Sequence, residues 1–168
     1  MEASQDQGGS AVTGGAHGAG HVLTARRWAY FDTSALVKRY VREEGSTRVG
    51  ALLRRHRVLS TAIVTVELVS ALRRRRLDGD VTPEDFGAIL GRLRKDRAHW
   101  NLVEVSPLVL SRAEELVQDS SLRTLDAIHV AGALVFEAAA GLRVPFVTGD
   151  YRQAESAEGL DMDVRRVG

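Results

Sequence analysis

The stretch LRTLDAIHVAGALVFEAAA, residues 122–140, carries the clearest fold signal in the chain. From Thr124 onward it is apolar on almost every side, which predicts a buried helix that Gly141 ends. Asp126 is the exception, because it begins a stripe that continues at helical spacing through His129 on the face that should be apolar. Burying an unpaired carboxylate costs on the order of several kcal/mol, so this acid needs a cation, a network of donors or a raised pKa.

Short apolar segments alternate with helical patterns through the rest of the chain. Strands are expected at residues 28–31, 57–60, 102–105, 144–147 and, more weakly, 162–167. Helices are expected from the N-cap Ser34 to about Val41, over 46–55, over 61–76, from Pro83 onward, over 106–117 and over 124–140. This alternation predicts an α/β fold with a central, mostly parallel sheet, and no internal repeat is visible.

Composition limits what the chain can be. Its 168 residues, with 44% hydrophobic side chains, fit one domain with a real core. The absence of cysteine excludes disulfides and thiolate-bound metals, which leaves oxygen or imidazole ligands for any metal. We expect residues 1–26, rich in Gly, Ala and Ser, to be a disordered tail, and residues 27–168 to form the domain. Without an apolar run of roughly 20 residues or a signal peptide, we expect a cytoplasmic protein with no membrane segment.

The charges are numerous but balanced, with 23 Lys and Arg residues against 22 Asp and Glu residues. Net charge therefore predicts no particular partner. Basic residues gather at 54–57, 73–76 and 92–97, where they could contact phosphates or could simply form solvated helix faces.

Two acidic residues follow predicted strands. Asp32 comes directly after the strand at 28–31, and Asp150 comes shortly after the strand at 144–147. Since ligands of open parallel sheets bind beyond the carboxyl ends of the strands, both carboxylates are expected at the same rim. Asp at a strand end also caps helices and makes turns, so either residue alone has a structural explanation.

Two further acids lie where helices should be apolar. Glu67 interrupts the apolar stripe of its helix, and Asp126 does the same in the helix described first. A structural salt bridge with Arg123 or with one of the arginines at 73–76 is the alternative for each acid. Together the four acids favour a shared site, and oxygen ligands without cysteine suit Mg²⁺ or Mn²⁺. Such an ion lowers the pKa of a bound water and steadies a leaving oxygen, which suits phosphoryl chemistry.

His129 lies three residues after Asp126 on the same face and could line this site. We interpret it as a satisfied structural histidine and not as a sign of zinc. The remaining histidines lie in the expected tail or in basic, exposed stretches, at His17, His21, His56 and His99.

Four segments resemble, in order, the motifs of PIN-domain proteins, and most closely those of VapC toxins from type II toxin–antitoxin pairs. The resemblance covers about residues 28–167, and the third segment is its most specific part. The segments are DTSALVK at 32–38, VELVSAL at 66–72, LRTLDAIHVA at 122–131 and VTGD at 147–150.

The resemblance implies a three-layer α/β/α fold and an endoribonuclease that depends on Mg²⁺ or Mn²⁺. Under it, Asp32 and Asp126 would be the principal metal ligands, and Glu67 and Asp150 would complete the acidic pocket. Supporting hydroxyls at motif positions would orient a carboxylate or a water. These are the hydroxyls of Thr33, Ser34 and Thr148.

The resemblance also implies partners: an RNA substrate, a cognate antitoxin and a second copy of the chain. We expect apolar surface near Leu36, Tyr40 and Val41 to form the homodimer interface. A housekeeping RNA-processing nuclease of the same family and a non-catalytic RNA-binding or interaction domain are the alternatives. Four intact acids argue against a non-catalytic domain, because without a metal the protein would gain by losing carboxylates that repel one another.

Overall fold

The computed structural model describes residues 27–168, so the tail expected at 1–26 lies outside the described residues. Within the described part, the strands form one sheet in the order β3-β2-β1-β4-β5, and every neighbouring pair is parallel. The expected α/β fold with a parallel sheet is therefore confirmed. The strands are β1 (Arg27–Phe31), β2 (His56–Thr61), β3 (Asn101–Val103), β4 (Phe146–Thr148) and β5 (Val164–Arg166).

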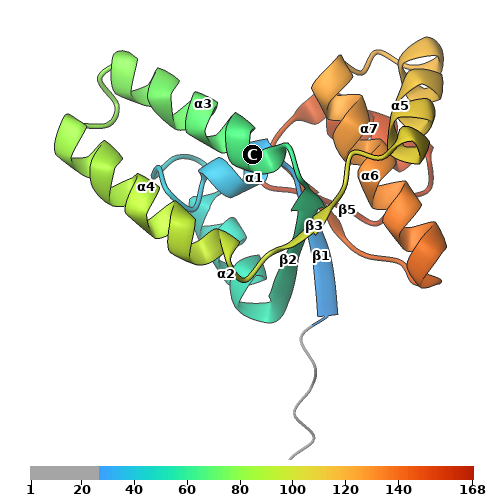
Figure 1. Ribbon diagram of the computed structural model, residues 1–168, viewed down its shortest axis with the longest axis horizontal. Helices are drawn as coiled ribbons and strands as arrows, with labels where there is room; N and C mark the ends of the chain where they lie inside the picture. The colour runs from blue at the N-terminus through green and yellow to red at the C-terminus, as the bar shows by residue number, and fades with distance from the viewer. Residues whose placement is uncertain (1–26) are drawn as a thin grey trace, which may run out of the picture.

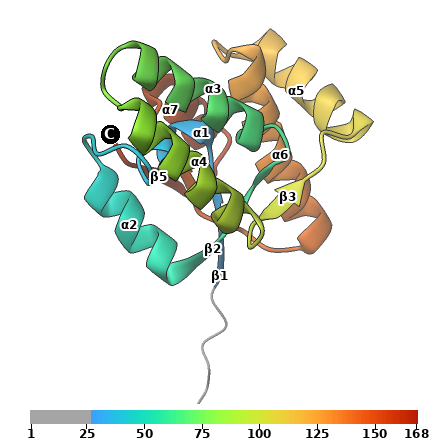
Figure 2. The same cartoon turned by 60° about the vertical axis from the view of Figure 1, so that its left-hand side comes forward.

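Helices cover both faces of the sheet, which gives three layers. One apolar core lies between the sheet and α1 to α4, and a second lies between the sheet and α5 to α7. Figure 1 shows α3 and α4 on one side of the strands and α5, α6 and α7 on the other, and Figure 2 shows the same layers from a second direction. No helix in residues 27–168 is long and apolar enough to cross a membrane. The helices are α1 (Thr33–Val37), α2 (Ser46–Arg55), α3 (Val64–Leu77), α4 (Pro83–Arg97), α5 (Pro107–Asp119), α6 (Thr124–Ala140) and α7 (Tyr151–Gly159).

Alternating side chains along β1 and β4 build the two cores. Tyr30 points to the face covered by α5 to α7, whereas Ala29 and Phe31 point to the face covered by α1 to α4. Tyr30 stacks on Phe146 of β4 with ring centroids 5.3 Å apart. These side chains are fully buried, so the central strands stabilise both outer layers at once.

The central position of β1 decides where a ligand site can form. From β1 the chain first adds β2 and β3 on one side, and it later adds β4 and β5 on the other. The connections that leave β1 and β4 therefore diverge, which opens a crevice at the carboxyl ends of these two strands. Helix α1 begins directly after β1 and α7 begins shortly after β4, so both helices start at this crevice.

The first helix differs from the sequence-based prediction. Its N-cap is Asp32 and not Ser34, because the Asp32 carboxylate accepts a hydrogen bond from the backbone N–H of Ala35. Helix α1 also ends at Val37, without continuing to Val41. The predicted cap was therefore wrong by two residues, in a segment where both residue types can cap a helix.

Two other elements depart from the pattern. Helix α3 begins at Val64 and not at Thr61, because Thr61 is the last residue of β2 and still pairs with β3. Helix α7 is not predicted by the sequence pattern at all. Its buried side chains make no large apolar stripe, because they are Gln153, Ala154 and Ala157.

The surface expected to form a dimer interface is largely covered. Leu36 is fully buried, so the prediction that it contributes to an interface is wrong. Tyr40 and Val41 are partly buried against the core under α1 to α4, and the Tyr40 hydroxyl donates to Asp96 at 3.0 Å. These side chains stabilise the monomer fold, because α1 ends early and the following turns pack inward.

The close contact of α6 with β2 yields a first prediction. A Cβ added at Gly132 would lie 2.4 Å from Thr61 Cγ2 and 3.2 Å from the Tyr30 hydroxyl. We expect Gly132→Ala to lower the free energy of unfolding by about 1–3 kcal/mol through overpacking. Gly91→Ala in α4 is the matched control, because a Cβ there meets nothing within 4 Å. It should raise stability by about 0.5–1 kcal/mol, since alanine is the better helix former. Urea unfolding of both variants measures the difference, and equal effects would contradict the packing described.

Candidate functional site

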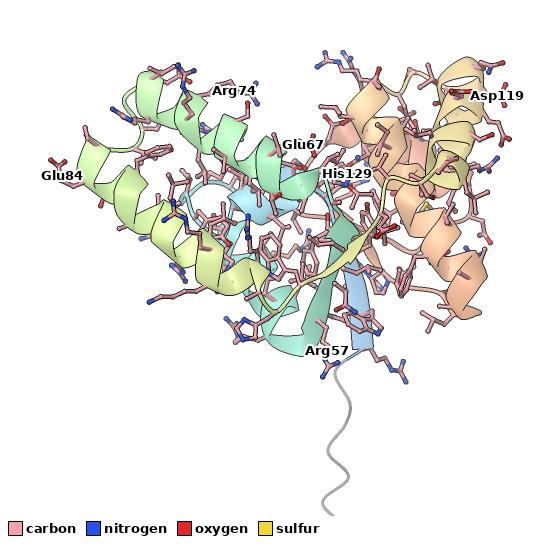
Figure 3. All side chains as sticks on the ribbon, viewed as in Figure 1. Arg57, Glu67, Arg74, Glu84, Asp119 and His129 are labelled. Atoms are coloured by element: carbon pink, nitrogen blue, oxygen red, sulfur yellow. The ribbon has the colours of Figure 1, made fainter. Side chains whose placement is uncertain are left out.

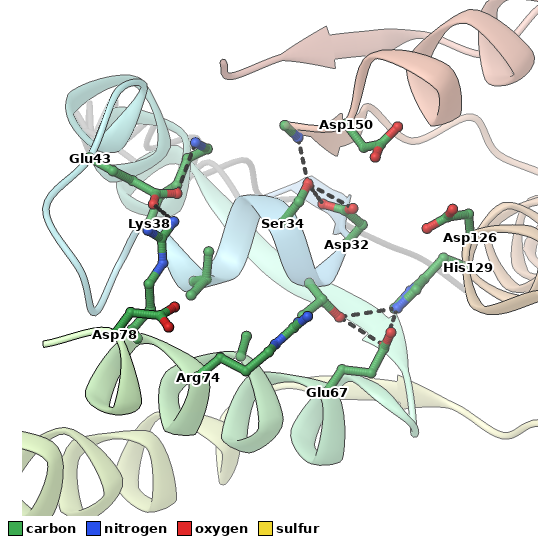
Figure 4. Close-up of a pocket in the computed structure, with 15 residues that line it drawn as sticks. Asp32, Ser34, Lys38, Glu43, Glu67, Arg74, Asp78, Asp126, His129 and Asp150 are labelled. Atoms are coloured by element: carbon green, nitrogen blue, oxygen red, sulfur yellow. Dashed lines mark hydrogen bonds and ion pairs between the residues drawn. The ribbon is translucent and has the colours of Figure 1, made fainter. Parts of the chain in front are cut away.

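A pocket of about 540 Å³ opens at the crevice between β1 and β4. All four acids predicted from the sequence line it, although they come from different elements. Asp32 follows β1, Glu67 lies on α3, Asp126 lies on α6 and Asp150 follows β4. Figure 4 shows these side chains around one opening, and Figure 3 places Glu67 and His129 between the two groups of helices. The structure therefore brings the predicted acids together at one rim of the sheet.

Asp32 is the most buried of these acids, with 4% of its surface exposed. Its Oδ1 atom accepts the backbone N–H of Ala35 at 2.8 Å, and both carboxylate oxygens lie 2.9 Å from the Ser34 hydroxyl. The Thr148 hydroxyl lies 3.2 Å from Oδ2. Burial raises the pKa of Asp32 above its usual range, while His129 and these hydrogen bonds act in the opposite direction. The carboxylate is thus held in one orientation by donors on two elements.

The hydroxyls of Ser34 and Thr148 tie this carboxylate to β4. Ser34 Oγ accepts the backbone N–H of Gly149 at 2.7 Å and lies 3.3 Å from Thr148 Oγ1. Thr148 Oγ1 also lies 2.7 Å from Gln153 Oε1 of α7. A Cβ on Gly149 would lie 2.9 Å from Lys38 Cε, so only glycine fits without a shift. Two of the three supporting hydroxyls predicted from the sequence, those of Ser34 and Thr148, therefore lie against the most buried acid.

Asp150 and Asp126 face the pocket from β4 and α6. Asp150 is the N-cap of α7, because its Oδ1 atom accepts the backbone N–H of Gln153 at 3.0 Å. Asp126 lies in the first turn of α6, where the helix dipole favours a negative charge. Burial raises the pKa of Asp126, and the negative charge of Asp150 raises it further. The two carboxylates are therefore close enough to repel each other.

Glu67 has a histidine as its partner. Its Oε2 atom lies 2.7 Å from His129 Nε2 and accepts the Thr33 hydroxyl at 2.8 Å. No arginine of the group at 73–76 forms an ion pair with Glu67 in the described chain, so that alternative is wrong for Glu67. The interpretation of His129 as a buried, satisfied histidine is confirmed, but its contact with Glu67 is a feature that the sequence-based reasoning missed. The signal available was the shared stripe of Asp126 and His129 on one helix face.

The basic residues of the pocket lie on its opposite wall, together with Glu43 and Asp78. Lys38, Arg74 and Arg75 line it. Lys38 pairs with Glu43 at 3.0 Å, and Arg75 pairs with Glu43 and, at 3.1 Å, with Asp80. Arg74 is exposed and forms no ion pair within residues 27–168, and Figure 4 shows it reaching from α3 into the pocket. One cation of this wall is thus available to a ligand.

The four acids offer carboxylate oxygens, which are the ligands that a hard divalent cation binds. In the described part of the chain, no lysine or arginine forms an ion pair with any of the four, so the alternative salt bridge to Arg123 is not formed either. Within the same residues, no three acidic or histidine side chains are arranged to hold a metal ion as they stand. Binding of an ion would therefore need some of these side chains to move, because carboxylates that repel one another relax apart without a cation. An all-oxygen donor set without sulfur suits Mg²⁺ or Mn²⁺.

Comparison with known proteins agrees with the fold and the position of the site. Residues 29–159 match the family model of the PIN domain. The chain therefore belongs to the PIN-domain family, and the resemblance seen in its sequence motifs is confirmed. Proteins of this family are generally nucleases.

Solved structures show the same fold at low sequence identity. The chain is similar to a toxin–antitoxin complex from Klebsiella pneumoniae, with a TM-score of 0.53 and 18% identity over 74% of this chain and 88% of that chain. It is also similar to VapBC2 from Rickettsia felis bound to a DNA fragment from their promoter, with a TM-score of 0.57 and 12% identity over 82% of this chain and 97% of that chain. No curated protein sequence matches the chain significantly. At these identities the structural likeness establishes the three-layer fold alone.

The raised pKa of Asp126 gives a second prediction. Because the folded pKa lies above the ordinary value of about 3.9, protonation of Asp126 favours the folded state. This contribution is present below the ordinary pKa and is lost as the pH rises through the raised pKa. In EDTA at pH 7, Asp126→Asn should therefore unfold at a denaturant concentration equal to or higher than that of the wild type. The difference should shrink as the pH falls toward about 4.

Added Mg²⁺ should reverse this order, since an ion that binds the native site stabilises the wild type by mass action. Asp119→Asn is the control, because Asp119 is an exposed acid on α5 that does not line the pocket. Guanidinium unfolding at each pH, with EDTA or Mg²⁺, provides the measurement. A large loss of stability for Asp126→Asn in EDTA would mean that the carboxylate has a structural role.

Proposed function

We propose that this chain is an endoribonuclease that depends on Mg²⁺ or Mn²⁺ and hydrolyses phosphodiester bonds in RNA. The observation that carries the proposal is the convergence of Asp32, Glu67, Asp126 and Asp150 on one pocket at the crevice of the sheet. Membership of the PIN-domain family supports it. Four carboxylates that form no ion pair with a lysine or arginine in residues 27–168 make a poor structural cluster but a good site for a divalent cation.

The residues divide the chemical tasks between them. Asp32 and Asp126 are proposed as the principal ligands, with Glu67 and Asp150 completing the acidic pocket. A bound divalent ion supplies positive charge that lowers the pKa of a water and neutralises the leaving oxygen. In the hydrolysis, the water oxygen bonds to phosphorus and the bond to the leaving sugar oxygen breaks. Ser34 and Thr148 donate hydrogen bonds to the Asp32 carboxylate and hold it in place. The orientation of this proposed ligand therefore depends on its hydrogen-bond partners as well as on its own side chain.

The basic wall supports a phosphate-bearing substrate. Arg74 reaches into the pocket from α3, where its guanidinium can contact a phosphate on the chain that is cleaved. RNA as the specific substrate rests on the resemblance of the four motifs to VapC toxins. The acids would then act on one phosphodiester while Arg74 holds the nucleic acid backbone.

We further propose that the protein is the toxin of a toxin–antitoxin pair. The two similar structures are both described as toxin–antitoxin assemblies, and this supports a small antitoxin as partner. An open pocket lined by acids suits a basic side chain of such a partner, which would compete with the metal. A homodimer and a cytoplasmic location belong to the same proposal.

Incubation of the purified chain with total RNA tests the activity. Wild type should cleave RNA in Mg²⁺ or Mn²⁺ and not in EDTA. Asp126→Asn should lose cleavage by a factor of about 100 or more, since metal chemistry is central to the reaction. Asp119→Asn, which changes an exposed acid outside the pocket, should cleave like the wild type. Cleavage that persists in EDTA, or in Asp126→Asn, would contradict the proposed site.

The role of Arg74 gives a separate prediction about binding. In the Asp126→Asn background, which keeps RNA intact, Arg74→Ala should weaken RNA binding and reduce the salt dependence of affinity by about one phosphate contact, a slope change of about 0.7 for a single strand. Arg73→Ala is the matched control, because Arg73 is exposed on the same helix but does not line the pocket. Fluorescence anisotropy of a labelled RNA over a range of salt concentrations measures both slopes. Equal slopes for the two variants would exclude a specific contact by Arg74.

A further inference from the structure

His129 lies on α6 at the base of the pocket, with 2% of its surface exposed. Both of its ring nitrogens have partners. Nδ1 lies 3.1 Å from the Tyr30 hydroxyl and 3.1 Å from the Thr61 hydroxyl. Nε2 lies 2.7 Å from Glu67 Oε2. The ring also meets Tyr30 edge-on, with centroids 6.0 Å apart. Groups on β1, β2 and α3 therefore fix the orientation of this imidazole.

The contacts place a proton on one of the two ring nitrogens. A carboxylate oxygen only accepts hydrogen bonds, so Nε2 carries the proton that points to Glu67. Nδ1 faces the hydroxyls of Tyr30 and Thr61, and each hydroxyl can donate or accept a hydrogen bond. Thr33 Oγ1 lies 3.3 Å from Nε2 and donates to Glu67 Oε2 at 2.8 Å. Within residues 27–168 no buried side-chain nitrogen or oxygen lacks a partner.

Both donors to Glu67 end on the same oxygen. Thr33 and His129 hold Oε2, and Glu67 itself is only partly buried, with 18% of its side chain exposed. Two donors on one oxygen restrict the rotation of the carboxylate, whereas Oε1 has no hydrogen-bond partner among residues 27–168 and belongs to a side chain that lines the pocket. A flexible glutamate on the rim of an open pocket thus becomes a ligand with one defined direction.

We infer that His129 is a positioning residue, which holds Glu67 so that Oε1 is presented to the divalent cation. The inference rests on the proposed function, and it assigns the imidazole a role outside the coordination sphere. Groups that orient metal ligands through hydrogen bonds change metal affinity by about 10- to 100-fold when they are removed. A buried histidine with a purely structural role would change the stability of the fold and leave metal affinity alone.

Two substitutions of His129 separate these roles. Gln places its amide nitrogen near the position of Nε2, so His129→Gln keeps a donor for Glu67. Asn reaches only as far as Nδ1, so His129→Asn keeps a polar group for Tyr30 and Thr61 but removes the donor to Glu67. Thr33→Val removes the other donor to Oε2 and leaves the His129–Glu67 hydrogen bond in place, and it serves as the second test should His129→Asn fail to fold.

Binding of Mn²⁺ to the full chain, read from the electron paramagnetic resonance signal of the free ion, is the measurement. We expect His129→Asn to raise the dissociation constant about 10- to 100-fold and Thr33→Val to raise it in the same direction. His129→Gln should stay within a few-fold of the wild type. Thermal unfolding in EDTA shows how much each variant changes the fold itself.

The outcomes distinguish this inference from the proposed function. If the wild type binds Mn²⁺ and His129→Asn or, where that variant does not fold, Thr33→Val binds it equally well, the positioning role is overturned while the metal site stands. If His129→Gln and His129→Asn weaken Mn²⁺ binding equally, the positioning role is also overturned, because loss of the donor to Glu67 would then not be the cause of the weaker binding. If the wild type itself binds no Mn²⁺, the proposed function fails.

Discussion

Hydrogen bonds to the buried Asp32 carboxylate join β1, α1 and β4 at the crevice of the sheet. The donors are the backbone N–H of Ala35 and the hydroxyls of Ser34 and Thr148. Without them, a carboxylate with so little exposed surface would destabilise the fold by several kcal/mol, on the order expected for a buried unpaired charge. The start of α1, the fit of Gly149 against Ser34 and the position of the pocket all depend on this network.

Capping a helix and lining a ligand pocket are compatible tasks for the same carboxylate. Asp150 caps α7 through Oδ1 alone, and its position on the pocket lining is unaffected by that bond. Asp32 likewise caps α1 while it lines the pocket. An acid at a strand end can therefore cap a helix and line the pocket at the same time. Helix starts that converge at the crevice of a parallel sheet hold such acids in fixed positions.

The sequence predicts the layers and the acids better than it predicts their partners. The alternation of strands and helices is visible as changes in the spacing of apolar residues along the chain. Glu67 and Asp126 are visible as charged residues at positions where the helix should be apolar. The partner of Glu67 is not visible in this way. His129 lies 62 residues away on the other face of the sheet, and the contact exists only because α3 and α6 both reach the same rim. Helix α7 is not predicted for a simpler reason: its buried face carries small and polar side chains, so it shows no apolar stripe.

Glu43 neutralises part of the positive charge that lines the pocket. Six carboxylates and three lysine or arginine side chains line the pocket, and Glu43 engages two of these cations, Lys38 and Arg75. The charge of Glu43 offsets those two cations, so they cancel less of the negative potential of the acids at the crevice. A cleft lined mainly by one sign of charge concentrates counter-ions from dilute solution and speeds their arrival. Under the proposed function, a glutamate that is not one of the four acids at the crevice would thus speed the arrival of a divalent cation.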